Sequence, residues 1–142
     1  MAYDKPNRIK YSFGNFDFGG AADETFSIFG PKGKAGRLWD YGVEGSIEIF
    51  NGNTVTPKIA VGTTGDPDAY GDELDLNALA DNHAKSVRST YLEAEAGFRT
   101  LMDVTANGRE IAANEEVVVT CTGATGSPTG QAVPYAIIDW MD

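Results

Sequence analysis

The chain contains only one cysteine, Cys121, and one histidine, His83, among its 142 residues. A single cysteine excludes an internal disulfide and a zinc site built from several cysteines. Histidine-rich metal sites, and triads or acid–base pairs built on imidazole, have only His83 to draw on. A nucleophile–base pair of Cys121 and His83 is disfavoured, because Cys121 stands in an apolar run typical of a core strand. We therefore expect that the chain is not an enzyme and needs no cofactor.

Basic residues are also scarce: 11 lysines and arginines oppose 21 aspartates and glutamates, for a formal net charge of −10. This excess of acid repels the phosphate backbone, and no cluster of lysine and arginine offsets it locally. The apolar runs are far shorter than the roughly 20 residues that a membrane-spanning helix needs. The first residues lack the apolar segment of a secretory signal. We expect neither a nucleic-acid nor a membrane partner, and synthesis in a host cytoplasm.

Glycine is abundant instead, with 17 residues. The glycines separate short runs rich in Val, Ile, Thr, Phe and Tyr, a pattern typical of a β-sandwich or barrel. The runs that favour strands cover residues 9–13, 16–18, 25–29, 37–50, 58–62, 91–104, 116–122 and 133–140. The sequence predicts an all-β fold, a single-domain antiparallel β-sandwich of jelly-roll-like form. Residues 1–15 would form an N-terminal arm and the start of the first strand, and residues 16–142 the sandwich.

The stretch 65–82 interrupts the strand pattern and predicts one long polar loop. Helical spacing occurs towards its end and allows at most one short helix. The positions that recur at this spacing are Leu76, Leu79, Ala80, His83, Ala84 and Val87.

The run 37–50 alternates as a half-buried strand does. One side carries Val43, Gly45, Ile47 and Ile49, and the other side carries Glu44, Ser46 and Glu48. Glu44 and Glu48 are a candidate carboxylate pair for a glycosidase, which needs two carboxyl groups about 5–9.5 Å apart across a groove. Because alternating acids are common on the exposed face of a strand, we prefer the interpretation as a solvated face.

The polar loop contains an acidic cluster that partly matches an EF-hand calcium loop. Asp66, Asp68 and Gly71 stand at its first, third and sixth positions, but Tyr70 and Asn77 replace the ligands expected at the fifth and twelfth. The EF-hand interpretation therefore fails. A weaker calcium site stays as the alternative to a solvated turn, which we prefer; its ligands would be Asp66, Asp68, Asp72 and Asp75.

Aromatic residues are candidates for a binding platform. Trp and Tyr stack on sugars, are enriched at protein interfaces, or fill cores. The sequence leaves these three alternatives open for Trp39, Tyr41, Tyr70, Tyr91, Tyr135 and Trp140.

Three segments together resemble one protein family. Residues 33–43 (GKAGRLWDYGV) are similar to a glycine-rich basic turn that enters a long strand. Residues 58–70 (KIAVGTTGDPDAY) resemble the strand and loop that follow it, and residues 122–140 resemble a Gly/Thr/Pro-tipped hairpin with a closing Asp-Trp. The combination is similar to the capsid decoration (cement) proteins of tailed bacteriophages, over roughly the C-terminal three quarters of the chain.

This resemblance implies a β-sandwich or jelly-roll subunit, commonly trimeric, bound to the outer surface of a capsid at its three-fold sites. The leading hypothesis is therefore a virion structural protein that stabilises the capsid by bridging capsomers. Its partners would be the major capsid protein and its own copies in a homotrimer. The alternative hypothesis is a phage head or fibre module that binds host surface glycans.

The closing run 135–140 supplies three candidate partner-binding residues. It is apolar on both faces, and such a strand suits burial against a neighbouring chain. The candidates are Tyr135, Ile137 and Trp140.

The first ten residues supply three more candidates. They hold Lys5, Arg8 and Lys10 against a single acid, Asp4, in an otherwise acidic chain. We expect this arm to dock on an acidic capsid surface, most strongly at low salt. Its deletion is then expected to weaken attachment and to leave the oligomer intact.

The preferred interpretation of the acidic cluster gives a first prediction. If the four aspartates form only a solvated loop, calcium leaves the melting temperature within about 1 °C of its value in chelator. A native-state calcium site that contributes about 1 kcal/mol would instead raise it by several degrees. Thermal unfolding with EDTA and with millimolar calcium measures the difference. A calcium-dependent rise of several degrees would contradict the solvated-loop interpretation.

Overall fold

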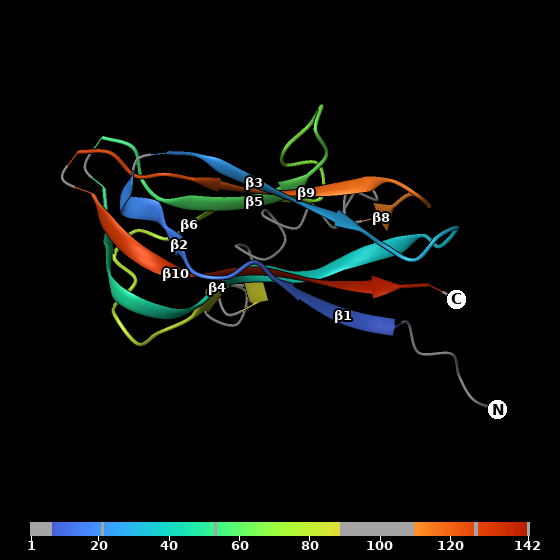
Figure 1. Ribbon diagram of the computed structural model, residues 1–142, viewed down its shortest axis with the longest axis horizontal. Helices are drawn as coiled ribbons and strands as arrows, with labels where there is room; N and C mark the ends of the chain where they lie inside the picture. The colour runs from blue at the N-terminus through green and yellow to red at the C-terminus, as the bar shows by residue number, and fades with distance from the viewer. Residues whose placement is uncertain (1–6, 21, 53, 89–109, 127, 142) are drawn as a thin grey trace.

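The computed structural model describes residues 7–20, 22–52, 54–88, 110–126 and 128–141. Two antiparallel sheets pack face to face, with their strands running along the long axis of the molecule (Figure 1). The predicted all-β sandwich is confirmed. The strand expected at 91–104 lies outside the described residues. A short strand, β6 (Gly71–Asp75), occupies part of the expected polar loop.

The larger sheet, sheet A, has six strands, and the smaller, sheet B, has four. Sheet A has the order β1-β10-β4-β7, with β2 beside β10 and β8 beside β4, and sheet B has the order β3-β9-β5-β6. The strands of sheet A are β1 (Asn7–Ser12), β2 (Phe16–Asp17), β4 (Gly36–Asn51), β7 (Lys85–Ser86), β8 (Glu110–Ile111) and β10 (Thr129–Trp140). The other strands of sheet B are β3 (Glu24–Phe29), β5 (Lys58–Gly62) and β9 (Glu116–Thr122), and a 3₁₀ turn, η1 (Phe18–Gly20), follows β2.

The core lies between the sheets and is closed at one end by Trp140. Alternate residues of β10 face sheet B, as the two-residue period of a strand requires, and Trp140 is the last of them. Its ring packs on Gly30 and Gly36, where a Cβ on Gly36 would lie 2.6 Å from the ring. Trp140 Nε1 donates a hydrogen bond to the Tyr11 hydroxyl at 2.8 Å. At 1 % exposed, Trp140 is a core residue and not the partner-contacting residue suggested by the sequence.

β4 changes its phase at Gly45. This glycine has a φ of +61°, in the left-handed region that glycine adopts without strain. The register with β10 shifts here, and beyond it Ser46 and Phe50 are buried. Ile47 and Ile49 are 62 % and 55 % exposed. The single alternation expected along this strand is therefore wrong beyond Gly45, because a bulge moves the following residues to the opposite face.

The segment between β6 and β7 runs along the edge of β4 and does not form the helix that its spacing allows. Ala78 N donates to Phe50 O at 2.7 Å, and Phe50 N donates to Leu79 O at 2.8 Å. Asn82 N donates to Ser46 O at 2.7 Å. The φ angles of Ala78 and Asn82 are +68° and +58°, which a right-handed helix does not contain. Backbone partners on β4 thus replace hydrogen bonds within a helix.

The expected N-terminal arm is part of sheet A over residues 7–10. β1 pairs with β10 from Asn7 opposite Trp140 to Ser12 opposite Tyr135, without a register shift. Residues 1–6, including Lys5, lie outside the described residues. Deleting residues 1–10 would remove four of the six residues of β1, so the deletion would test the fold as well as attachment.

Gly42 allows β7 to lie against β4 and gives the second prediction. A Cβ at Gly42 would overlap the backbone of Lys85 and lie 2.7 Å from Ser86 Cα. We expect Gly42→Ala to lower the free energy of unfolding by about 1–3 kcal/mol, because these backbone atoms cannot move aside as a flexible side chain can. Gly65→Ala is the matched control, since no atom lies within 4 Å of its Cβ position. Urea denaturation compares the variants, and equal stability would contradict the close contact.

Candidate partner-binding surface

The face of sheet A that points away from sheet B brings together four of the six candidate partner-binding residues. Arg8 and Lys10 of β1 lie on this face, where Lys10 is opposite Ile137 of β10. Tyr135 is the neighbouring outward residue of β10, because Ala136 between them is buried in the core. The other two candidates are Trp140, in the core, and Lys5, outside the described residues.

Arg8 and Lys10 are bound by acidic residues of their own sheet. Arg8 Nε donates to Asp139 Oδ1 at 2.6 Å, and a second guanidinium nitrogen donates to Oδ2 at 3.0 Å. Lys10 Nζ donates to the Glu44 carboxylate at 2.7 Å. Both pairs are exposed, and such pairs stabilise a fold by at most about 1 kcal/mol each. Their larger effect is to neutralise the positive charge that the sequence assigns to this part of the chain.

Trp39 lies between two arginines that are distant in the sequence. The Arg8 guanidinium carbon is 4.0 Å from the centre of the indole ring, and the Arg88 guanidinium carbon is 3.9 Å from it. Arg88 Nε also donates to the Trp39 carbonyl at 2.7 Å. Cation–π contacts of this kind contribute about 0.5–2 kcal/mol. The cluster therefore holds Arg88, which follows β7, against the outer face of sheet A.

Asp40 is a buried acid beneath this cluster, 6 % exposed. Its Oδ1 accepts hydrogen bonds from Tyr41 N at 2.9 Å and from Arg88 N at 3.3 Å, and the Ser86 hydroxyl donates to the carboxylate as well. Burial raises the pKa of Asp40, while these hydrogen bonds and the Arg88 charge oppose the rise. Burial also raises the pKa of nearby Tyr135 to about 12. The two side chains share Ser86 as a hydrogen-bond partner.

The sequence did not indicate Asp40 and Arg88 as members of this surface. Asp40 stands between Trp39 and Tyr41 in a strand with a half-buried pattern. An acidic residue at that position is the one feature of the sequence that could have indicated a buried carboxylate. Arg88 lies 48 residues further along the chain, and no local pattern links it to Asp40.

The aromatic residues do not form an exposed platform in the described part of the chain. Tyr41, Tyr70, Tyr135 and Trp140 are all between 0 % and 7 % exposed. Trp39 is half-buried and carries the two arginines. Tyr91 lies outside the described residues. The described tyrosine and tryptophan rings therefore pack within the fold and are not arranged to stack on a ligand.

The candidate nucleophile and base, Cys121 and His83, are not brought together. Cys121 is fully buried in β9, and burial raises the pKa of its thiol, whereas His83 is exposed in the turn before β7. Glu44 binds Lys10, while Glu48 Oε1 accepts a hydrogen bond from Gly130 N at 2.8 Å. Each carboxylate thus has its own local partner.

Two of the four aspartates of the candidate calcium loop accept local hydrogen bonds through their carboxylates. Asp72 Oδ1 accepts from Glu73 N at 2.7 Å, and Asp75 Oδ1 accepts from Asn77 N at 2.8 Å. Asp66 and Asp68 are exposed in the turn before β6. Among the described residues, no three His, Cys, Asp or Glu side chains gather closely enough to hold a metal ion.

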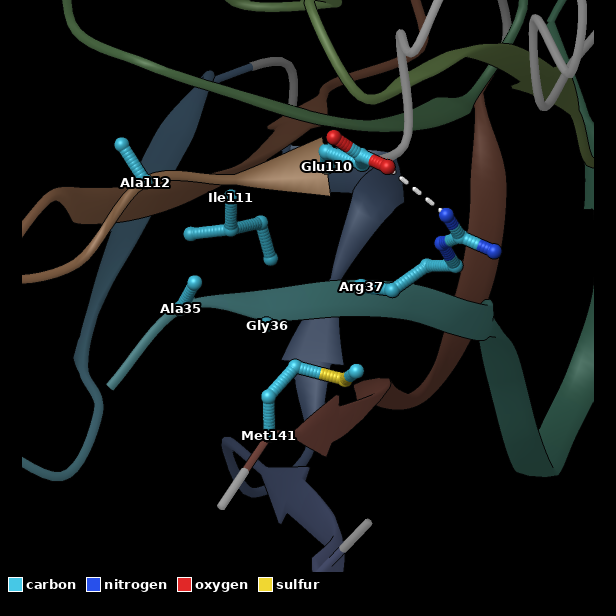
Figure 2. A pocket seen from close by; sticks show the side chains of 7 residues that line it. All are labelled: Ala35, Gly36, Arg37, Glu110, Ile111, Ala112 and Met141. Carbon is cyan, nitrogen blue, oxygen red and sulfur yellow. Dashed lines mark hydrogen bonds and ion pairs between the residues drawn. The ribbon is translucent and has the colours of Figure 1, made fainter.

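A hollow of about 520 Å³ opens at the end of sheet A where β8 meets β4 (Figure 2). Ala35, Ile111, Ala112 and Met141 supply apolar atoms to its wall. Ile111 is buried, and Met141 is 50 % exposed. The ion pair between Arg37 and Glu110, at 2.7 Å, stands at its rim. The two charged side chains of its lining pair with each other, so they do not form a convergent polar set for a substrate.

Comparison of the chain with protein-family models, with curated proteins and with solved structures finds no match. The resemblance to capsid decoration proteins therefore stays a prediction. Within the residues that the structure describes, no helix is long and apolar enough to cross a membrane.

Asp40 gives the third prediction. The pKa of Asp40 in the folded protein lies above the ordinary value of 3.8. The stability that Asp40 contributes is therefore complete below pH 3.8 and is lost as the pH rises through the pKa of the folded state. Asp40→Asn keeps an oxygen acceptor and cannot ionise. We therefore expect D40N to gain stability relative to wild type as the pH rises from about 4 to 7. Urea denaturation across this range measures the difference, and a difference that does not change with pH would contradict the burial effect.

Asp40→Ala is the companion variant, because it removes the acceptor itself. It leaves the backbone N–H groups of Tyr41 and Arg88 without their carboxylate partner. We expect it to be less stable than D40N by about 1–3 kcal/mol in the free energy of unfolding at every pH in the same series.

Proposed function

We propose that this chain is a virion structural protein that decorates and stabilises a tailed-phage capsid by bridging capsomers. It acts as a homotrimer on the outer capsid surface, and its partner is the major capsid protein. The resemblance of residues 33–43, 58–70 and 122–140 to decoration proteins supplies the functional class. One structural feature supports the mode of attachment, the outer edge of β1.

β1 is a regular edge strand. It pairs with β10 over six residues without a register shift, and no strand in the described ranges pairs with its other side. Residues 7–10 are exposed. Proteins normally protect such an edge with bulges, prolines, charges or a covering segment. The charges present here, Arg8 and Lys10, are neutralised by their own sheet, so they oppose a further strand only weakly.

The side chains of β1 fit attachment by strand addition. Ile9 lies opposite Ile138, on the face turned towards sheet B, yet it is 38 % exposed because sheet B does not cover it. A strand added beside β1 would gain main-chain hydrogen bonds and would bury Ile9. Strand addition by a segment of the capsid protein therefore supplies binding energy without any chemistry.

The glycan-binding alternative finds less support. Stacking on sugars needs exposed rings, and the four buried tyrosine and tryptophan side chains are not available for it. Trp39, the half-buried ring, is in contact with Arg8 and Arg88. If soluble host glycans inhibit the binding of this chain to capsids, that result would favour the glycan-binding alternative over decoration.

The fourth prediction tests attachment through β1. Ile9→Lys places a charge on the face that an added strand would cover, at a position exposed enough to accept it in the free protein. We expect about tenfold or greater loss of affinity for undecorated capsids of the phage that encodes the chain, since the ammonium group must be desolvated. Co-sedimentation with the capsids measures occupancy against protein concentration.

Ile47→Lys is the matched control, because it makes the same chemical change at an exposed position of β4, 62 % exposed. We expect it to bind as wild type does. Circular dichroism confirms that both variants are folded. Equal affinity of wild type and Ile9→Lys would contradict attachment through β1, and no binding of wild type would contradict the decoration function.

A further inference from the structure

We infer that the open edge of β3 binds β3 of a second copy of this chain, in an antiparallel pair with a two-fold axis at Ser27. The contact belongs to sheet B and is separate from the β1 edge of sheet A, which the proposed function assigns to the capsid. It does not depend on that function. Where the proposed trimer forms, the contact joins copies of neighbouring trimers, because a two-fold contact pairs copies and does not close a ring of three.

β3 is an edge strand that lacks the usual protection against pairing. It pairs with β9 from Glu24 to Phe29 without a register shift, and no strand in the described ranges pairs with its other side. Residues 25–29 contain no charge, no proline and no bulge, the features that normally protect an edge. An uncharged run of β-forming residues at an open edge favours pairing with another chain.

The fold holds this edge in place. The Phe26 ring stacks on the Phe13 ring, with their centres 4.8 Å apart, and Phe13 N donates to Pro134 O of sheet A at 3.1 Å. At the end of the strand, Gly30 packs on the Trp140 ring. Because the edge is ordered in the single chain, a strand that adds to it loses little conformational entropy on the β3 side.

Charges of opposite sign at the two ends of β3 identify a second copy as the occupant. Glu24 begins the strand and Lys32 stands in the turn after it, and both are exposed. Neither makes an ion pair with another residue of the described ranges. Antiparallel pairing of two identical strands brings Glu24 of each copy towards Lys32 of the other, whereas parallel pairing would bring like charges together. Opposite charges at both ends therefore favour this partner and this orientation.

The neighbouring acids leave this arrangement intact. Glu116, beside Phe29 on β9, is one strand further from the edge. Its carboxylate accepts hydrogen bonds from the Ser27 hydroxyl at 2.6 Å and the Thr64 hydroxyl at 3.2 Å. Asp23 accepts a hydrogen bond from Gly123 N at 2.9 Å and carries the same charge as the adjacent Glu24. The two ends of the edge thus keep opposite signs.

Strand geometry selects Ser27 as the centre of the pair. Opposite residues of an antiparallel pair point to the same face, so a two-fold axis passes beside a residue that faces its own copy. Ser27 is the middle of the uncharged run 25–29, and an axis there pairs this run with itself. The opposite pairs are then Phe29 with Thr25 and Phe26 with Ile28. Both join an aromatic to a β-branched residue, a combination that stabilises antiparallel sheets.

Phe29 gains most from this pairing. It is the most exposed of the large apolar side chains that the structure describes, at 71 %. In the inferred pair its ring lies beside Thr25 of the other copy and is partly removed from water, which is favourable for an apolar group of this size. The two-fold symmetry doubles the gain, because each copy contributes the same ring.

The fifth prediction uses the two-fold axis itself. In the inferred pair Ser27 lies opposite Ser27 of the other copy, with Cα atoms about 4.5–5.5 Å apart, a distance that a disulfide spans. We expect full-length Ser27→Cys to form a disulfide-linked dimer when oxidised glutathione accepts the two electrons. Thr25→Cys is the matched control, because the two Thr25 residues of a pair are about 13 Å apart along the strands. We expect it to cross-link at least about tenfold more slowly.

Non-reducing electrophoresis measures the rate of cross-linking, and thermal unfolding checks that each variant is folded. The native Cys121 is fully buried, so wild type supplies the background rate.

A mixture of two variants tests the register. Thr25→Cys and Phe29→Cys are each expected to cross-link slowly alone, whereas an equimolar mixture is expected to form the mixed dimer rapidly, because these residues lie opposite each other. Adding Ser27→Lys to both chains places two like charges at the axis and is expected to slow the mixed cross-link about tenfold. Adding Ile47→Lys makes the same change at an exposed position of sheet A and is expected to leave the rate unchanged.

Three results would each overturn the inference. They are equal rates for Ser27→Cys and Thr25→Cys, a mixture that cross-links no faster than its two components, and a mixed cross-link that Ser27→Lys does not slow.

Capsid binding separates this inference from the proposed function. If Ser27→Cys cross-links rapidly and wild type does not bind capsids, the contact between copies stands and the decoration function fails. If wild type decorates capsids and Ser27→Cys cross-links no faster than Thr25→Cys, decoration stands and the inferred contact fails.

Discussion

The antiparallel pairing of β4 with β10 positions the other strands of sheet A and the outer face of that sheet. β10 joins β1 on one side, and β4 carries β7, β8 and the segment of residues 76–83 on the other. Three register shifts interrupt the pairing, and they decide what the outer face presents. The shift beside Ile137 places Trp39 where two arginines reach it, and the shift near Gly45 exposes two isoleucines. The irregularities of one strand pair, more than its regular part, determine the surface of the sandwich.

The parts of the fold that local pattern determines could be predicted from the sequence. The runs 58–62 and 116–122 have the same limits as β5 and β9, because β-branched apolar residues and flanking turn residues are both local signals. The two-residue period also places Arg8 and Lys10 on one face of β1, and Tyr135 and Ile137 on one face of β10. The pairing that sets these two strands side by side is long-range and does not follow from local pattern.

The rest depends on contacts between residues far apart in the sequence. The closing run is apolar on both faces, so local pattern does not show that Trp140 turns inward; the space left by Gly30 and Gly36 decides it. Asp40 and Arg88 form one site through a hydrogen bond that spans 48 residues. A single bulge at Gly45 reverses a predicted face, and glycine in a strand marks such a position without fixing its effect. Tertiary packing supplies these details.

The pairing of β1 with β10 has a consequence for folding during synthesis on the ribosome. β1 is synthesised before the other described strands and β10 after them, yet residues 7–12 pair only with residues 135–140 in sheet A. β1 therefore has no partner strand until almost the whole described chain has emerged from the ribosome. Pairings of such long sequence separation slow folding, because the entropy of closing the intervening chain is lost before the contacts form. Sheet A is completed last, and a nascent chain that stalls before β10 leaves both β1 and β4 open to mispairing.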